Sequence, residues 1–327
     1  MNTINSIQKT AVAAIPAACG ELVQGTWQGR PCLVSCPIDQ YSTATVTVSR
    51  AKLRAQQQPQ FLKANQALLA GLAWLGREQS HGRFSIDTAI PRSRGYGSST
   101  ADIGAVLYAL AQACERPLPP NQASLLATQI ESTDSTLFSG LAMFDPINGH
   151  LIESFPETPP LIVIVIDPGK VVDPIKYHKQ DYQNTLKELA PTHQIAFAFL
   201  KQGLLFRDWE MVGRASTLSA TAQQKIVFNP FLDKTLKFAK SVSALGICRT
   251  HCGSVLGLLL DPVKVDVNAI YQYARSHLPA QAKISITSLV AGGPRYGMLS
   301  KEYTVSQKPQ KHGVLSVGAN AYKQQSS

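Results

Sequence analysis

The residues best suited to chemistry lie in one short run of glycines, hydroxyl side chains and arginines between residues 91 and 101. Two glycines let the backbone turn tightly and approach a ligand without side chains in the way. The hydroxyls and the positive charges could hold phosphate oxygens or a divalent ion. The candidate residues are Pro91, Arg92, Ser93, Arg94, Gly95, Tyr96, Gly97, Ser98, Ser99, Thr100 and Ala101.

The elements on either side of this run indicate how it is positioned. Residues 84–90 alternate apolar and polar side chains, as in a half-buried strand. After the run, apolar residues recur every three or four positions from Ile103 to Cys114, which predicts a helix with one buried face. A helix N-terminus presents unpaired N–H groups and partial positive charge, so this order suits a phosphate-binding loop. A purely structural turn followed by a serine cap is an equally good interpretation.

Three familiar loop types do not match. No lysine follows the second glycine of a G-x-x-x-x-G pattern, so there is no Walker A motif. Thr100 stands where the dinucleotide fingerprint needs its third small residue, and Pro91 interrupts the junction with the strand. The central position of Gly95-Tyr-Gly-Ser-Ser99 is glycine, which excludes a nucleophile elbow.

Composition limits the class of protein and of partner. The chain has 327 residues, 44% of them hydrophobic, which predicts a globular protein. Its formal charge of +10 favours an anionic partner, but the basic residues are scattered, so no nucleic acid is expected. The longest aliphatic run, residues 161–166, is too short to span a membrane, and no signal peptide is evident. We therefore expect a cytoplasmic protein.

Six cysteines in a chain of this length do not predict a disulfide framework. Cys32 and Cys36, and Cys248 and Cys252 with His251 beside them, could in principle hold zinc, but their spacing differs from the usual knuckles. Buried free thiols are the better interpretation.

Other segments have recognisable patterns. Residues 11–48 look like strands joined by a turn at Gly25–Pro31, and helices are expected near 62–75, 182–206 and 209–224. Asn121 is the expected N-cap of a helix over 122–130 that ends at Glu131. Residues 161–166 and 255–260 read as strands, and 289–293 as a segment closing the sheet.

Three segments resemble the motifs of the GHMP kinases. The run Pro91–Ala101 is similar to their ATP loop, P-x-x-x-G-L-G-S-S-A, with Tyr96 and Thr100 as departures. Residues 16–25 resemble the first motif, which lines the acceptor substrate, but without the lysine of the mevalonate kinase version. Residues 245–259 resemble the third motif, G-A-x-x-A-H-S-G-T-x-x-G.

The resemblance implies an α+β, two-lobed GHMP kinase fold. Residues 1–158 would form an N-terminal lobe like domain 2 of ribosomal protein S5, and residues 159–300 a ferredoxin-like C-terminal lobe, followed by a tail at 301–327. ATP and Mg²⁺ are the implied cofactors, and an acceptor would bind between the lobes. A homodimer is one option for the oligomeric state.

The same resemblance assigns the site. Glu131 follows Ser99 at the interval of the family's magnesium-binding glutamate, so the two are the expected metal ligands. Asp134 is the candidate for the residue that takes the acceptor's proton, with Asp145 in reserve, although a capping role is as good an interpretation for either. Glu21, His251 and Gly253 are expected near the substrate.

Within the superfamily, residues 16–25, 131–145 and 249–253 look most like the L-threonine kinases of cobalamin synthesis. Such an enzyme would convert ATP and L-threonine to ADP and O-phospho-L-threonine. Kinases of homoserine, mevalonate or a sugar are the alternatives. A basic S5-like regulator or nucleic-acid-binding protein is the non-enzymatic alternative.

Overall fold

A computed structural model describes residues 8–51, 53, 59–169, 182–251, 253–278 and 281–297. The predicted tail at 301–327 lies outside these residues. The strands of the described part are β1 (Lys9–Trp27), β2 (Arg30–Ser49), β3 (His81–Thr88), β4 (Leu141–Asp145), β5 (His150–Phe155), β6 (Ile162–Asp167), β7 (Gly246–Arg249), β8 (Leu256–Leu260), β9 (Lys283–Ser288) and β10 (Arg295–Tyr296).

These strands form one ten-stranded sheet in the order β5-β4-β2-β1-β7-β8-β6-β9, with β10 pairing β1 and β3 pairing β2. Strands from the first half of the chain thus occupy one end of the sheet, and most of those from the second half occupy the other. The two groups meet where Glu21 of β1 pairs with Arg249 of β7. The mixture of helices and antiparallel strands agrees with the predicted α+β class, while the division into lobes at residue 158 stays a prediction.

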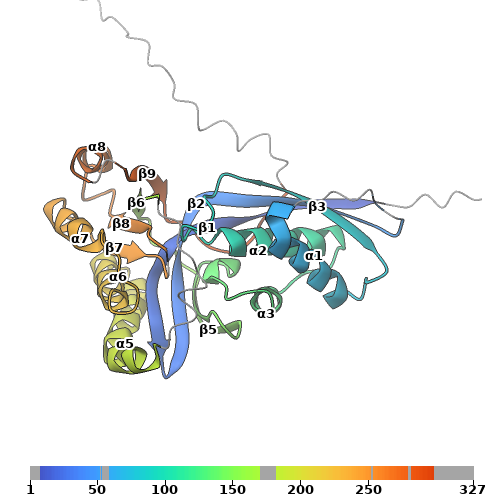
Figure 1. Cartoon of the computed structure of the whole chain (residues 1–327), viewed down its shortest axis with the longest axis horizontal. Helices are drawn as coiled ribbons and strands as arrows, with labels where there is room; N and C mark the ends of the chain where they lie inside the picture. Colours follow the sequence, from blue (N-terminus) through green and yellow to red (C-terminus); the bar gives the residue numbers. More distant parts are fainter. Residues whose placement is uncertain are drawn as a thin grey trace, which may run out of the picture. The chain divides into compact units, whose positions relative to one another are not determined.

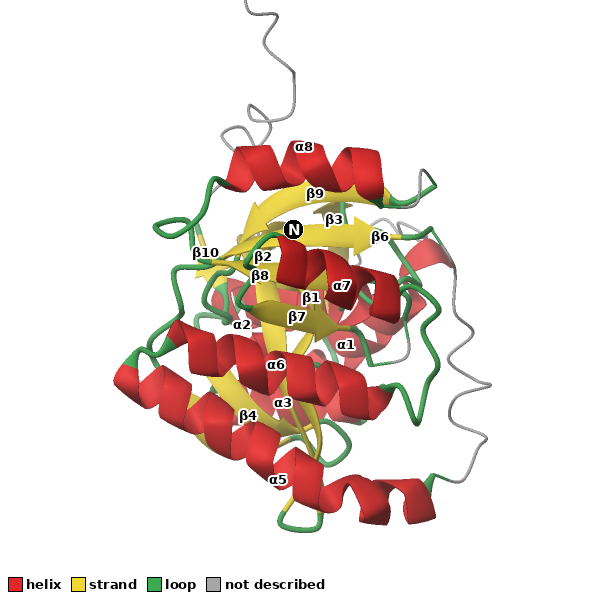
Figure 2. Ribbon diagram, turned by 90° about the vertical axis from the view of Figure 1, so that its left-hand side faces the viewer, coloured by secondary structure: helices red, strands yellow, loops and turns green. Residues whose placement is uncertain are grey.

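The helices are α1 (Leu62–Trp74), α2 (Ser98–Ala113), α3 (Pro120–Thr128), α5 (Gln183–Phe206), α6 (Trp209–Gln223), α7 (Leu232–Ser241) and α8 (Val267–His277), with short 3-10 turns η1 (Pro59–Phe61) and η2 (Ser135–Leu137). Helices α1 to α3 gather beside the first group of strands (Figure 1). Helix α5 packs on β1 and α6, α6 packs on both β1 and β7, and α7 and α8 lie against strands of the second group. Figure 2 shows α5, α6 and α7 together across one face, with α8 beside β9.

Helix α2 lies at the centre of the larger hydrophobic core and packs on β1, β2 and α1. The predicted apolar face from Ile103 to Cys114 is buried, but so are Asp102, Gly104 and Ala105. The prediction of a single buried face was therefore too narrow. Small residues allow close packing on the other sides, because a Cβ at Gly104 would overlap the Leu137 side chain.

Two local predictions were wrong. Asn121 lies inside α3, whose N-cap is Pro119 with Pro120 in the first turn, because proline supplies the dihedral angle that a helix start needs. The strand beyond β6 is β9, whereas the predicted closing segment 289–293 makes only two isolated bridges, Leu289 with Ile38 and Gly292 with Gly140. The β1–β2 hairpin, by contrast, turns within the predicted segment, at Gln28 and Gly29.

The five cysteines that the structure describes are buried and free, as the thiol interpretation predicts. Cys252 lies outside the described residues, so the second candidate zinc pair is described only in part. The described residues contain no group of three or more histidine, cysteine or acidic side chains placed to hold a metal.

Candidate active site

The glycine loop ends in a helix N-terminus that is open to a ligand. Gly97 is the N-cap of α2 and has a left-handed backbone, with φ of 62°. The first hydrogen bond of the helix runs from the Ala101 N–H to the Gly97 carbonyl at 3.0 Å. The N–H groups of residues 98–100 precede this bond, so they remain available to an anion. The backbone of this arrangement alone has the features that suit an anion such as phosphate.

All three sequence motifs converge on Thr250, which is buried. A Cβ at Gly20, from the first motif, would overlap the backbone of Arg249 and Thr250, and one at Gly95, from the loop, would overlap the Thr250 side chain. A Cβ at Gly253 would overlap the Arg94 carbonyl. These glycines are therefore needed for close packing between the motifs. The backbone of Gly253 packs against the backbone of the loop at Arg94.

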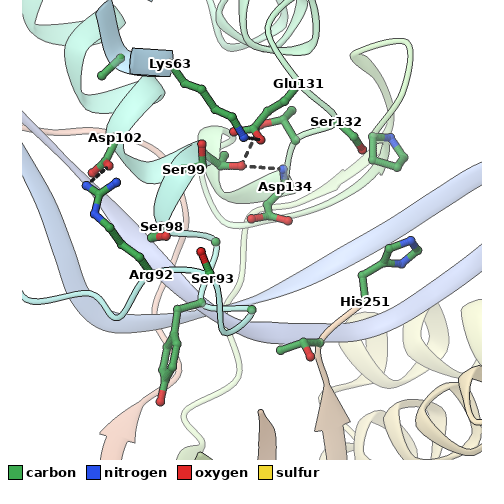
Figure 3. Close-up of a pocket in the computed structure, with 18 of the residues that line it drawn as sticks. Lys63, Arg92, Ser93, Ser98, Ser99, Asp102, Glu131, Ser132, Asp134 and His251 are labelled. Carbon is green, nitrogen blue, oxygen red and sulfur yellow. Dashed lines mark hydrogen bonds and ion pairs between the residues drawn. The ribbon is translucent and has the colours of Figure 1, made fainter. Parts of the chain in front are cut away.

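A cavity of about 450 Å³ opens over this loop, within the range of small-ligand sites. Figure 3 shows Lys63, Glu131 and Asp134 on one side and His251 on another. Of the predicted site residues, those that line the cavity are Glu21, Arg92, Ser93, Gly95, Tyr96, Gly97, Ser98, Ser99, Thr100, Glu131, Asp134 and His251. Those that do not line it are Pro91, Arg94, Ala101, Asp145 and Gly253.

Asp134 lies directly against the loop. A Cβ at Gly97 would overlap the Asp134 Oδ2 atom, so only glycine leaves room for this carboxylate. The backbone N–H of Asp134 donates to the Thr100 hydroxyl at 3.2 Å. Burial, and next the negative charge of Glu131, raise the pKa of Asp134 to about 6. A carboxylate with this pKa, beside a phosphate site, is suited to accept a proton near neutral pH.

Glu131 is a second acidic residue of the cavity wall, three positions before Asp134 in the chain. It forms an ion pair with Lys63 of α1. Its second oxygen, Oε1, is buried and has no hydrogen-bond partner among the described residues. An unpartnered carboxylate oxygen in the same cavity as the Ser99 hydroxyl fits a magnesium ion, which prefers hard oxygen ligands and keeps water and phosphate oxygens in its shell.

The two departures from the family's loop pattern each make specific contacts. The Tyr96 hydroxyl donates to Oδ2 of the buried Asp167, at 3.3 Å, and Arg94 pairs with the same oxygen at 3.1 Å. Thr100 accepts from the Thr133 hydroxyl at 3.0 Å. Tyr96 and Arg94 therefore tie the loop to the end of β6, and Thr100 ties α2 to the segment that carries Asp134.

Phe61, Lys63 and Asp102 are among the residues of the cavity wall that the sequence analysis did not name as site residues. Arg92 stacks on the Phe61 ring, 4.5 Å from its centroid, and pairs with Asp102 at 2.7 Å. Lys63 supplies from α1 the positive charge that the first motif lacks. Its place at the start of a predicted helix was the available signal, but a single lysine there is usually solvated.

His251 and Asp145 have different surroundings. The His251 Nδ1 atom lies 2.6 Å from Oε1 of Gln24, whose own amide donates to the Arg249 carbonyl, so the ring is held at the cavity edge. The Asp145 carboxylate instead accepts from the N–H groups of Ile147 and Asn148, at 2.9 and 3.0 Å. This is the geometry of a turn cap.

Replacing Gly97 with alanine tests how closely loop and acid fit. Gly97→Ala adds strain at a positive φ and pushes on Asp134, so we expect kcat to fall at least about tenfold, because a displacement of about 1 Å has large effects on a reaction. Gly76→Ala is a matched control, since Gly76 has φ of 63° and no atom lies within 4 Å of the position that its Cβ would take. Both variants should lose about 1 kcal/mol of stability from the positive φ, and only Gly97→Ala adds the overlap with Asp134. Equal turnover in both, measured by ADP release, would show that the contact with Asp134 is unimportant.

Comparison with known proteins agrees with this geometry. Residues 63–143 match the model of the GHMP kinases N-terminal domain. An L-threonine kinase of Salmonella typhimurium is 32% identical over 257 residues, which cover 79% of this chain and 85% of that protein.

The fold is also that of known structures. A homoserine kinase from Cytophaga hutchinsonii superimposes with a TM-score of 0.66 at 19% identity, covering 90% of this chain and 100% of that one. A structure of MDDEF in complex with MVAPP, AMPPCP and magnesium gives a TM-score of 0.67 at 15% identity, with 90% and 100% covered. No helix in the described part of the chain has the length and apolar character needed to cross a membrane. By its sequence motifs, its relatives and its fold, the chain belongs to the GHMP kinases.

Proposed function

We propose that the protein transfers the γ-phosphoryl group of ATP to the hydroxyl of L-threonine, giving ADP and O-phospho-L-threonine. The observation that carries the proposal is the contact between the Asp134 carboxylate and Gly97, which brings a proton acceptor to the end of a phosphate-binding loop. The 32% identity to an L-threonine kinase supports the choice of acceptor. By the same relationship, the product would serve as precursor of the aminopropanol linker of cobalamin.

The loop and the start of α2 would bind the phosphates of ATP. Their N–H groups and the Ser98 hydroxyl face the cavity, and the helix N-terminus adds partial positive charge. Ser99 and Glu131 would hold Mg²⁺, as the unpartnered Glu131 oxygen allows. When bound, the ion would neutralise charge on the transferring group. Lys63, now paired with Glu131, would exchange that partner for the added anionic charge of the nucleotide.

Asp134 would orient the threonine hydroxyl and accept its proton. Phosphoryl transfer needs little covalent chemistry from the protein, because most of the acceleration comes from placing the acceptor in line and stabilising charge. Thr100 holds the Asp134 backbone on α2, and Gly97 leaves space for the carboxylate. The acceptor would therefore be positioned by the same helix that binds the phosphates.

An acceptor screen tests the proposal directly. ADP release from ATP and Mg²⁺ should be fastest with L-threonine among L-threonine, L-serine, L-homoserine and mevalonate. Phosphate must appear on the hydroxyl oxygen, which mass spectrometry and ³¹P NMR of the product would verify. A preference for L-homoserine or mevalonate would assign a different acceptor within the same family. Absence of transfer to all of them, with salt-sensitive gel shifts on nucleic acid, would favour the regulatory alternative.

A further inference from the structure

The first motif places a buried acidic residue, Glu21, in the cavity wall, and the proposed mechanism gives this residue no role. Glu21 is 4% exposed and lines the cavity. The pairing of β1 with β2 shifts register on both sides of it, between Ala18 and Glu21 and between Glu21 and Val23. Such bulges turn a side chain out of the regular alternation. The bulges thus explain how an acidic side chain within a long, buried hairpin comes to line the cavity.

The Glu21 carboxylate is only partly satisfied. Ser35 lies opposite it in the pairing of β1 with β2, but its Oε2 atom is buried without a hydrogen-bond partner among the described residues. No lysine, arginine or histidine side chain in the described part of the chain lies within ion-pair distance of it. A buried carboxylate without a counter-charge is costly, so its retention calls for a cationic ligand group.

The balance of charge in the cavity leads to the same conclusion. Glu21, Glu131 and Asp134 contribute carboxylates to its wall. The two long cationic side chains there are already engaged, Lys63 with Glu131 and Arg92 with Asp102. Burial, and next the charge of Asp134, raise the pKa of Glu21 well above its usual value. A positively charged group of the ligand would lower the pKa of Glu21 again and so favour the ionised carboxylate.

Glu21 is also held in register with Asp134. Ser35, which lies opposite Glu21 in the pairing of β1 with β2, exchanges two hydrogen bonds with Ser135: each backbone N–H donates to the other residue's hydroxyl, at 3.0 and 3.1 Å. Ser135 directly follows Asp134 in the chain. The two acids are therefore positioned by one pair of serines, so a ligand bound to Glu21 would be fixed relative to Asp134.

We propose that Glu21 binds the α-ammonium group of the acceptor and so selects an amino acid over an alcohol that lacks an amine. The assignment rests on the proposed function and extends it. Asp134 would contact the hydroxyl at one end of the acceptor, while Glu21 would contact the ammonium group near the other. Mevalonate has no ammonium group and would leave Glu21 unpaired, so the cavity should reject it.

The test compares Glu21→Gln with the wild type on two ligands. The variant keeps the shape of the side chain and removes its charge. A charge-assisted hydrogen bond of about 2 kcal/mol converts to about thirtyfold in KM for L-threonine. Because the ammonium contact is made equally before and during transfer, kcat should change by less than about threefold. The Ki of (R)-3-hydroxybutyrate, which is L-threonine without its amine, should stay within about threefold of the wild-type value.

One control variant and the pattern of results separate the outcomes. Glu115→Gln makes the same substitution at an exposed ion pair and should leave both ligands unaffected. Equal losses for L-threonine and (R)-3-hydroxybutyrate, or no loss for either, would overturn the ammonium assignment, as would an altered Mg²⁺ requirement with unchanged KM for L-threonine. Normal threonine turnover by the wild type in these cases would leave the proposed function standing. If the wild type did not phosphorylate L-threonine, both proposals would be refuted.

Discussion

Asp134→Asn should lower kcat for threonine phosphorylation by about 100- to 10,000-fold, the range for loss of a general base. The amide keeps the shape of the side chain against Gly97 but cannot accept the hydroxyl proton. Binding of ATP should change little, because the loop and the start of α2 are intact. Steady-state ADP release and equilibrium titration with a non-hydrolysable ATP analogue would measure the two effects separately.

The wild type and this variant should also differ in pH dependence. Burial and the charge of Glu131 raise the pKa of Asp134 to about 6. Because the ionised form is the base, wild-type kcat/KM should fall about tenfold per pH unit below about pH 6 and level off above it. The residual activity of Asp134→Asn should lack this acidic limb. If the limb remained in the variant, another group would be responsible for it.

The same pKa shift has a consequence for stability. A folded-state pKa raised above the unfolded value stabilises the protein below the unfolded pKa, and this stabilisation is lost as pH rises through about 6. Ionisation of Asp134 therefore lowers the free energy of unfolding at pH 8. Asp134→Asn removes this charge and should raise Tm at that pH by about 2 °C. At pH 4 the gain should largely disappear. Asp145→Asn is the matched control: its amide oxygen can still accept from the N–H groups of the turn, but its NH2 group cannot accept from the Asn148 side chain, so it should lower Tm while sparing kcat.

Glu131→Ala should lower turnover at least about 1,000-fold, which corresponds to about 4 kcal/mol of lost charge stabilisation. The variant removes the carboxylate with the unpartnered buried oxygen and also leaves Lys63 without its ion-pair partner. The concentration of Mg²⁺ needed for half-maximal activity should rise. Rates measured across a magnesium titration, with folding checked by circular dichroism, would test this.

Glu115→Ala offers a comparison for this variant, since Glu115 also pairs with a lysine, Lys9, but lies exposed and away from the cavity wall. Its turnover and magnesium dependence should match the wild type. Ser99→Ala should resemble Glu131→Ala, because both residues would bind the same ion. Near-normal activity of either variant in saturating magnesium would remove that residue from the proposed metal site.

Much of the site could be predicted because it is encoded locally. The glycines of the loop, the hydroxyls after them and the apolar periodicity of α2 lie within about thirty residues of one another, so pattern and spacing predicted the turn and the helix, and the resemblance to the GHMP kinases was needed to choose a phosphate loop over a structural turn. The acids were predictable only through resemblance to the GHMP kinases, since an acidic residue after a helix is ordinarily solvated. Nothing in the local sequence of Asp134 indicates that its carboxylate touches Gly97.

What could not be predicted depends on contacts between distant segments. The ion pair of Lys63 with Glu131 and the stacking of Arg92 on Phe61 join α1 and η1 to residues far along the chain. Likewise, Tyr96 and Arg94 looked like departures or phosphate ligands until their shared partner, Asp167, was placed beside them. The strand β9 was missed because its short alternating pattern carries little signal without its neighbour β6.

The packing of three motif glycines around Thr250 bears on how the enzyme becomes active during synthesis. A nascent chain that has left the ribosome as far as residue 200 already contains the entire glycine loop, both proposed magnesium ligands and the proposed base. It lacks Thr250, against which Gly95 and Gly20 rest. We therefore expect competence to bind nucleotide to be acquired late, when the last quarter of the chain packs against the first, and a protein cut short before that point would carry the proposed phosphate, magnesium and base residues without the packing that positions the loop.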